Sequence, residues 1–224
     1  ALNADADGFG TADIIYGGNV GKWQKFANSL RLKLAMVIAD VDPGTAGAKI
    51  AASAALPLIT ANADNALFKY VGAPNNNPLS NDVPPRSARQ DFVMANTLVD
   101  EMNTLNDPRR AAYFTTVGGE YVGGKYGFSN VYANFSTFST KVTATTFPGN
   151  MLDASEVNFL LAEAVERGFI TGDAKSYYDA AITASLAYWG VTGVEDYLAQ
   201  ATVDYSNAGS GASWQEKIGT QKWI

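Results

Sequence analysis

Two stretches of the sequence combine aromatic rings with amide and basic side chains, a mixture suited to recognising a sugar. Residues 72–89 (GAPNNNPLSNDVPPRSAR) and residues 113–138 are rich in Asn, Gly, Pro, Ser and Tyr, which is typical of loops. A flat ring packs on the apolar face of a pyranose, while amides and cations bond its hydroxyl groups. The candidate platforms are Tyr121, Tyr126 and Tyr132, and the candidate polar partners are Asn75, Asn76, Asn77 and Arg86.

Tyr126 is the first choice among these platforms. Gly123, Gly124 and Gly127 flank it and carry no side chain that could cover its ring. Each candidate also fits an ordinary solvated loop residue, because turns favour Asn, Gly and Ser for conformational reasons alone. Trp23 and Trp189 fall on expected helix faces, and we expect both in the core.

Catalysis has little support in the sequence. Cysteine and histidine are both absent, which excludes thiol nucleophiles, disulfides, Cys/His zinc sites and histidine general bases. A helical glycosidase would need two carboxylates across a cleft. Glu156, Glu163 and Glu166 share helix faces, but a cap, a structural hydrogen bond and solvation explain them more simply. Nucleotide and serine-hydrolase motifs are also missing. We expect no catalytic residue and no cofactor.

The first residues resemble part of a calcium-binding loop. Asn3-Ala4-Asp5-Ala6-Asp7-Gly8 places oxygen ligands at alternate positions with a glycine at the turn. The twelfth position of such a loop needs a bidentate acid, and here it is Ile14. We therefore expect a turn rich in Asx residues and no metal site.

Composition restricts the remaining classes. The chain has 224 residues, a net charge of -6 and 47% hydrophobic residues, enough for one sizeable core or two small ones. Lys and Arg are not concentrated on one face, so nucleic acid is not an expected partner. No apolar run approaches the roughly 18–20 residues of a membrane span.

The central element is an expected long helix over Trp23–Val41. It has two apolar faces, so we expect it to lie between two other layers. Leu32 and Met36 form the narrower face. Leu34 lies on the broader face, and the pattern predicts that it is buried. The members of that broader face are Trp23, Phe26, Ala27, Leu30, Leu34, Val37, Ile38 and Val41.

The other expected elements make the chain mainly α, with long loops and a few short strands. Helices are expected over about 45–56, 90–105, 153–168 and 174–189, a strand over 67–71, and short strands and loops over 113–150. Asp153 and Glu156 form an expected capping box, and Gly168 an expected C-terminal cap. The last two helices form a hairpin that resembles a tetratricopeptide unit.

Several runs also resemble one known family. Asp13-Ile14-Ile15-Tyr16-Gly17-Gly18-Asn19, Lys22-Trp23 and the run FANSLRLKLAM at 26–36 resemble the D-x-x-Y-x-G-D, K-W and F-A-N-S-L-R-L-R-L-A-M segments of SusD/RagB-like proteins. The N-D-P-R run at 106–109, the run EVNFLLAEAVERG at 156–168 and the Q-K-W-I run at 221–224 add to the match. The resemblance covers nearly the whole chain.

The resemblance implies a SusD-like helical domain with tetratricopeptide-like hairpins. It implies an excerpt, 1–224, of a protein about twice as long, lacking an N-terminal half and a C-terminal tail. It also implies a surface lipoprotein of the Bacteroidetes outer membrane, anchored through a lipid outside this sequence. Such a protein binds oligosaccharide without altering it and delivers it to a SusC-type TonB-dependent transporter. Two alternatives remain open: a tetratricopeptide-like module that binds protein, and an α-helical glycoside hydrolase.

Overall fold

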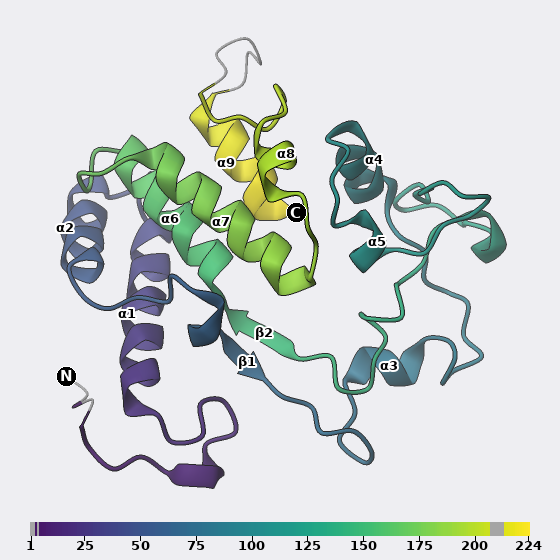
Figure 1. Cartoon of the computed structure of the whole chain (residues 1–224), viewed down its shortest axis with the longest axis horizontal. Helices are drawn as coiled ribbons and strands as arrows, with labels where there is room; N and C mark the ends of the chain where they lie inside the picture. The colour runs from purple at the N-terminus through teal and green to yellow at the C-terminus, as the bar shows by residue number, and fades with distance from the viewer. Residues whose placement is uncertain (1–2, 4, 207–212) are drawn as a thin grey trace. The chain divides into compact units, whose positions relative to one another are not determined.

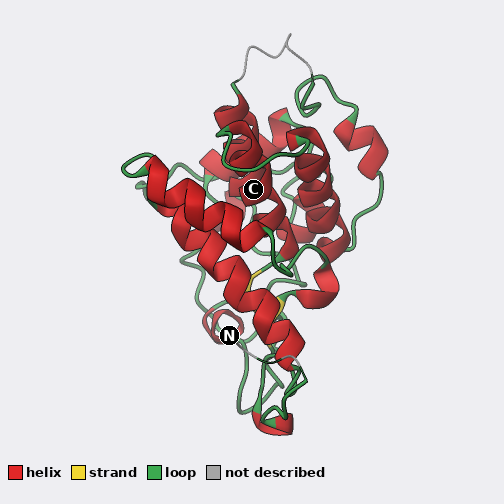
Figure 2. Cartoon of the chain, turned by 90° about the vertical axis from the view of Figure 1, so that its left-hand side faces the viewer, coloured by secondary structure: helices red, strands yellow, loops and turns green. Residues whose placement is uncertain are grey.

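Helices make up most of the regular structure, as the apolar periodicity predicts (Figure 2). The computed structural model describes residue 3, residues 5–206 and residues 213–224. By its contacts the chain divides into two compact units. Unit 1 comprises Ala1–Phe68, Asn150–Tyr188 and Asp204–Trp223, and unit 2 comprises Lys69–Gly149, Trp189–Val203 and Ile224. In the described part of the chain, no helix is both long and apolar enough to cross a membrane.

The elements of unit 1 are mainly long helices (Figure 1). They are α1 (Val20–Val37), α2 (Pro43–Ala54), α6 (Ala154–Glu166), α7 (Ala174–Trp189, whose last residue belongs to unit 2) and α9 (Trp214–Trp223), with short 3-10 helices at Gly10–Ala12 and Asn62–Asp64. Strand β1 (Ala66–Phe68) pairs with β2 (Gly149–Leu152) in a two-stranded sheet. The strand expected at 67–71 is therefore present, but it begins one residue earlier and ends at Phe68.

Helix α1 packs against α2 and α6 through the face that carries Leu32 and Met36. Leu32 is fully buried, and Met36 is 7% exposed. The prediction that Leu34 is buried is wrong, because its side chain is 60% exposed, and Val37 and Val41 are exposed too. Phe26 and Leu30, on the same broader face, are half-buried against the core, so the exposed part of that face is its later part. Periodicity identifies apolar faces but does not say how much of each face the neighbouring elements cover.

Helix α1 also ends earlier than expected, at Val37 instead of Val41. Asn19 caps its start by accepting a hydrogen bond from the backbone N–H of Lys22, at 2.9 Å. Asp42 then caps α2 through the N–H of Thr45, at 3.0 Å, and Pro43 occupies the first turn of that helix. Because Asp42 caps a new helix, residues 38–41, which were expected to form the last turn of α1, instead connect α1 to α2.

Helix α6 is the most buried element of unit 1. Its N-cap is Asp153, which accepts the N–H of Glu156 at 2.8 Å, as expected. The carboxylate of Glu156 pairs instead with Lys33 at 2.9 Å. Gly168 follows the last turn with φ 70°, a left-handed value that suits glycine and confirms the expected cap. Helices α6 and α7 then form the expected hairpin, with the rings of Phe159 and Tyr178 5.9 Å apart.

Unit 2 has shorter helices and more loop. They are α3 (Pro78–Asp82), α4 (Asn96–Thr104), α5 (Arg110–Tyr113), α8 (Val194–Leu198) and a 3-10 helix at Tyr132–Asn134. The helix expected over 90–105 is wrong in its first part, since α4 begins at Asn96. The N–H of Met94 bonds Ser136 O at 2.8 Å, and the N–H of Asn96 bonds Gly124 O at 2.8 Å. These pairings hold the preceding backbone extended, so tertiary contacts override helix propensity.

Candidate functional site

An exposed turn of unit 2, residues 123–131, is called the tip loop below. Its base is fixed by two glycines that lie against the segment before α4. A Cβ on Gly123 would lie 2.3 Å from Asn96 Cα, and one on Gly124 would lie 2.6 Å from the side chain of Val93. The N–H of Gly124 also bonds Met94 O at 2.7 Å. Only glycine permits this approach of the two backbones, so both glycines hold the loop in place.

The turn at the end of the tip loop is also ordered by hydrogen bonds. The N–H of Phe128 bonds Lys125 O at 3.2 Å, which closes a four-residue turn. Gly127 is its third residue and has φ 77°, the positive value that such a turn requires. The Asn130 side chain accepts from the N–H of Lys125 at 3.1 Å and donates to Lys125 O and Phe128 O. Hydrogen bonds within the loop itself therefore order this turn.

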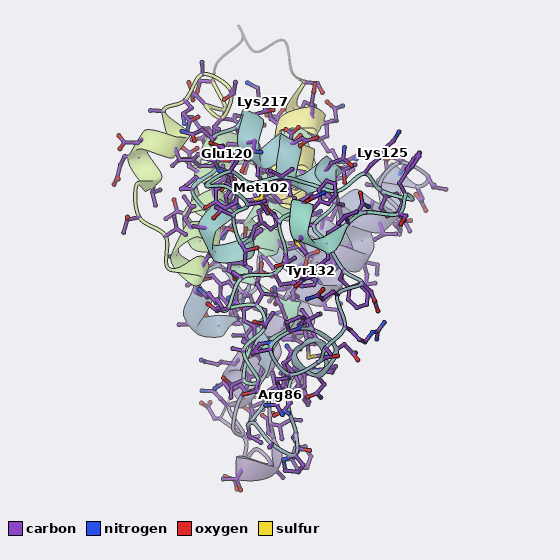
Figure 3. The ribbon with its side chains drawn as sticks, turned by 90° about the vertical axis from the view of Figure 1, so that its right-hand side faces the viewer. Arg86, Met102, Glu120, Lys125, Tyr132 and Lys217 are labelled. Atoms are coloured by element: carbon purple, nitrogen blue, oxygen red, sulfur yellow. The ribbon has the colours of Figure 1, made fainter. Side chains whose placement is uncertain are left out.

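The tip loop presents apolar side chains to solvent. Tyr126 is 80% exposed, Phe128 62% and Val131 65%. The expectation that the ring of Tyr126 is uncovered is confirmed. The Lys125 ammonium lies 4.0 Å from the centre of the Phe128 ring, a cation–π contact. Lys125 is itself exposed, and Figure 3 labels it within unit 2. The two exposed rings can stack on a sugar, and the ammonium group over Phe128 can donate hydrogen bonds to hydroxyl or acidic groups of that sugar.

The other two predicted tyrosines lie elsewhere in unit 2. Tyr121 is half-buried, with its ring 6.3 Å from Phe114 and the Arg110 guanidinium 5.4 Å above it. It therefore packs against the core of unit 2. Tyr132 is half-buried and lines a small hollow with Arg89 and other residues.

Arg86 is exposed, but it does not join the tip loop. Figure 3 shows Lys125 and Arg86 at well-separated places in unit 2, with Tyr132 between them in height. Arg86, in the predicted loop stretch 72–89, therefore does not form a common site with the tip loop of the stretch 113–138.

The predicted asparagines have mainly structural contacts. Asn77 caps α3: its side-chain oxygen accepts the N–H of Leu79 at 2.9 Å, and its amide donates to Phe147 O at 2.7 Å. Asn77 is buried with both polar atoms engaged. Asn76 donates to Asn81 at 3.0 Å, whereas Asn75 is exposed. The interpretation of 72–89 as one loop was therefore incomplete, because it contains a capped helix.

Sequence reasoning missed two members of the tip loop. Phe128 and Lys125 were not chosen as candidates, because attention went to tyrosines and to the Asn-rich stretch. A signal was nevertheless present: KYGF places a basic residue and an aromatic one at the two ends of a turn centred on Tyr-Gly. A second pair, Arg89 over the ring of the half-exposed Phe92 at 5.1 Å, was also missed. The carboxylates of Asp82 and Asp91 occupy that guanidinium.

Unit 1 contains a larger hollow, of about 780 Å³, among the residues before α1. Phe9, Ile14 and Trp23 are among its lining residues, and Phe9 is 85% exposed. Asp7 and Asp13 both line it, and the carboxylate of Asp13 is occupied. Asp13 accepts the N–H groups of Ile15, Tyr16 and Gly18 and the indole N–H of Trp23, at 2.7–3.1 Å. Trp23 thus has a structural hydrogen bond and is half-buried, which partly confirms its expected core position.

These hydrogen bonds determine the charge state of Asp13. Partial desolvation alone would raise the pKa of this carboxyl, but the bonds from Trp23, Tyr16, Gly18 and Ile15 outweigh it and lower the pKa to about 2. Burial, with the charges of Asp64 and Asp13 nearby, raises the pKa of the Tyr16 hydroxyl to about 12. The D-x-x-Y-x-G run therefore builds a structural turn before α1, rather than an acid or base for catalysis.

A buried ion pair lies within unit 2, in the N-D-P-R run. Arg109 is 1% exposed, and its guanidinium bonds the Asp107 carboxylate at 2.5 Å. Tyr197 also donates to that carboxylate, at 2.8 Å. Burial opposes the charge of Arg109, but the bonds to Asp107 prevail and raise the pKa of the guanidinium above its usual value. The pair is closed to ligands and joins α8 to the chain before α5.

Acid clusters do not suggest a metal centre. Among the residues that the structure describes, no group of three or more acidic side chains is placed to hold an ion. At the start of the chain, the Asn3 side chain accepts the N–H of Asp5 at 3.1 Å, so the Asx turn expected there is present.

The comparisons with known proteins agree with the fold. A family model described as starch-binding and associating with the outer membrane matches residues 1–224. The chain belongs to the SusD-like family. A SusD homologue from Bacteroides uniformis is 34% identical with a TM-score of 0.84, over 99% of this chain and 52% of its own. A SusD-like protein from Bacteroides thetaiotaomicron is 31% identical with a TM-score of 0.79, over 100% of this chain and 52% of its own.

A further SusD homologue, from Flavobacterium johnsoniae, is described as chitin-binding. It is 29% identical with a TM-score of 0.82, and the match covers 98% of this chain and 51% of that one. The chain thus spans about half the length of the SusD-like structures that it matches. A search of curated proteins found no match. The helical SusD-like fold that the sequence predicted is confirmed.

Proposed function

We propose that the protein binds oligosaccharide at the cell surface without catalysis and delivers it to a SusC-type TonB-dependent transporter in the outer membrane. The family description, starch-binding and associating with the outer membrane, supports the ligand class and the location. The chitin-binding relative supports a polysaccharide ligand. A lipid anchor outside this sequence would hold the protein on the membrane surface.

The observation that carries the proposal is the tip loop. Two largely exposed aromatic rings, Tyr126 and Phe128, stand on a turn fixed by Asn130 and by the glycines at its base. Ordering such rings on binding has little entropic cost, because the turn is already formed. By analogy with stacking on nucleic acid bases, each ring should contribute about 1–3 kcal/mol. Tyr126 is the ring we expect to contribute most.

The test is isothermal titration of the protein with oligosaccharides chosen from a glycan array. Tyr126→Ala should weaken binding about tenfold or more, since about 1.4 kcal/mol corresponds to a factor of ten. The matched control is Phe9→Ala, which removes a ring of similar exposure from the hollow of unit 1. Loss of binding in the control, with Tyr126→Ala and Phe128→Ala silent, would move the site to that hollow. Release of reducing sugar would favour the hydrolase instead.

The partner and the location have tests of their own. Affinity purification from outer membranes should recover a TonB-dependent transporter with the protein. Protease treatment of intact cells should cleave the protein if it stands on the outer surface. Recovery without a transporter, or protection from protease on intact cells, would contradict that part of the proposal.

A further inference from the structure

We infer that the tip loop prefers an anionic sugar, one that carries a carboxylate or a sulfate, over a neutral one. The inference rests on the proposed function, since it names the ligand class of the same loop. It is carried by the placement of the Lys125 ammonium over the ring of Phe128, in the same turn as the exposed ring of Tyr126.

Lys125 gives the tip loop its charge. It is the one formally charged residue in the sequence from 121 to 140. Within the described residues, no carboxylate lies within ion-pair distance of its ammonium group. Glu120 is close in sequence, but Figure 3 shows its side chain well separated from Lys125 in unit 2.

Several other cations of unit 2 have intramolecular partners. Arg89 pairs with Asp82 and Asp91, Arg109 with Asp107, and Lys141 donates to Trp189 O at 2.6 Å. The ammonium of Lys125 instead lies over the Phe128 ring, 4.0 Å from its centre. Its three donors can therefore meet an anion that reaches the rim of that ring.

The position of the ammonium is also restricted. Asn130 and the turn fix the backbone of Lys125, and the ring of Phe128 holds the end of its side chain. A sugar ring that stacks on Phe128 can then bring an acidic substituent next to a cation that is already in place. A charge-assisted hydrogen bond of this kind is stronger than one to a neutral hydroxyl. Because the site is exposed, solvent screening keeps the gain modest.

The experiment compares three ligand arms by isothermal titration: a uronate oligosaccharide, a sulfated oligosaccharide and a neutral chitooligosaccharide of equal length. Wild-type protein should bind at least one anionic arm more tightly than the neutral arm. Raising salt from about 0.05 M to about 0.5 M should weaken the anionic arm, because it shortens the Debye length. The neutral arm should change little.

Variants at Lys125 separate charge from packing. Lys125→Met keeps an apolar stem for Phe128 and should weaken the favoured anionic arm about threefold to tenfold, the range between a screened pair and a charge-assisted hydrogen bond. It should weaken binding of the neutral arm less than binding of the anionic arm, because a bond to a neutral hydroxyl is the weaker one, and Lys125→Arg should restore anionic binding. Comparing the affinities for the uronate and the sulfated oligosaccharide identifies which acidic group the tip loop prefers.

The outcomes distinguish the inference from the proposed function. If Tyr126→Ala abolishes binding while Lys125→Met changes all arms equally or none, the loop binds glycan without charge selection and the inference is overturned. Equal or tighter wild-type binding of the neutral arm would overturn it too. If no arm binds wild-type protein and the glycan array is silent, the proposed function fails, and the inference fails with it.

Discussion

The fully buried Leu32 provides a sharp test of which face of α1 belongs to the core. Leu32→Ala removes three carbon groups from a side chain with no exposed surface. At about 0.8 kcal/mol per buried methylene, the transfer loss is about 2.4 kcal/mol, and the cavity left behind adds to it. The surrounding core includes Met36, Ile50 and Leu160, all buried, so the hole should close only in part. We expect a loss of about 3 kcal/mol, within the 2–5 kcal/mol range for such truncations.

The matched control is Leu34→Ala, two residues along the same helix. It makes the same chemical change at a side chain that is 60% exposed, so its cost should stay below about 1 kcal/mol. Urea denaturation followed by far-ultraviolet circular dichroism gives both free energies of unfolding. A Leu34→Ala loss equal to or greater than the Leu32→Ala loss would show that the broader apolar face is the buried one, and would refute the packing of α1 described above.

Three further predictions concern the turn before α1, the buried ion pair and the tip loop. The folded-state pKa of Asp13 is lowered to about 2 from an ordinary 3.8, so the contribution of Asp13 to folding stability is present above about pH 4 and is lost as pH falls towards 2. Asp13→Asn should flatten that part of the plot of melting temperature against pH, and an unchanged plot would contradict this. Asp107→Ala leaves the Arg109 guanidinium buried without its carboxylate and should cost about 3–5 kcal/mol in urea denaturation. The double variant Asp107→Leu with Arg109→Met removes both charges and should cost less, and a larger loss in the double variant would refute the pairing. Gly127→Ala should cost about 1–2 kcal/mol of stability, because the φ of Gly127 is 77°. Gly123→Ala should cost more and displace the loop, because its new Cβ would lie 2.3 Å from Asn96 Cα; equal melting temperatures for the two variants would count against this backbone approach.

The helices were predictable where the local signals agree. Asp153 was predicted as the N-cap of α6 and Gly168 as its end, and both are confirmed. Asn19 and Asp42, which cap α1 and α2, were not predicted, although such caps are local signals. The runs at 13–36 and 156–168 also identified the family, which periodicity by itself would not have done.

Tertiary choices were not predictable in the same way. Leu32 and Leu34 have the same side chain, and which of them is buried depends on where α2 and α6 pack. The segment before Asn96 has helical propensity but pairs with Gly124 and Ser136 across a long stretch of chain. Local propensity is a weak prior against such pairing.

The candidate site shows the same division. The exposure of Tyr126 followed from its glycine neighbours, and the structure confirms it. The structural role of Asn77 depends on Phe147, 70 residues away, which no local pattern indicates. Lys125 and Phe128 meet across a single turn, so their contact was within reach of sequence reasoning once Gly127 was recognised as the turn residue.

The decisive experiment is a crystal structure of the protein with a bound oligosaccharide. We expect a sugar ring packed on Tyr126 or Phe128, at the van der Waals distance of about 3.5–4 Å between carbon atoms. We also expect an unchanged turn at Gly127. A sugar bound in the hollow beside Phe9, or elsewhere with no contact to the tip loop, would show that the tip loop is not the binding site.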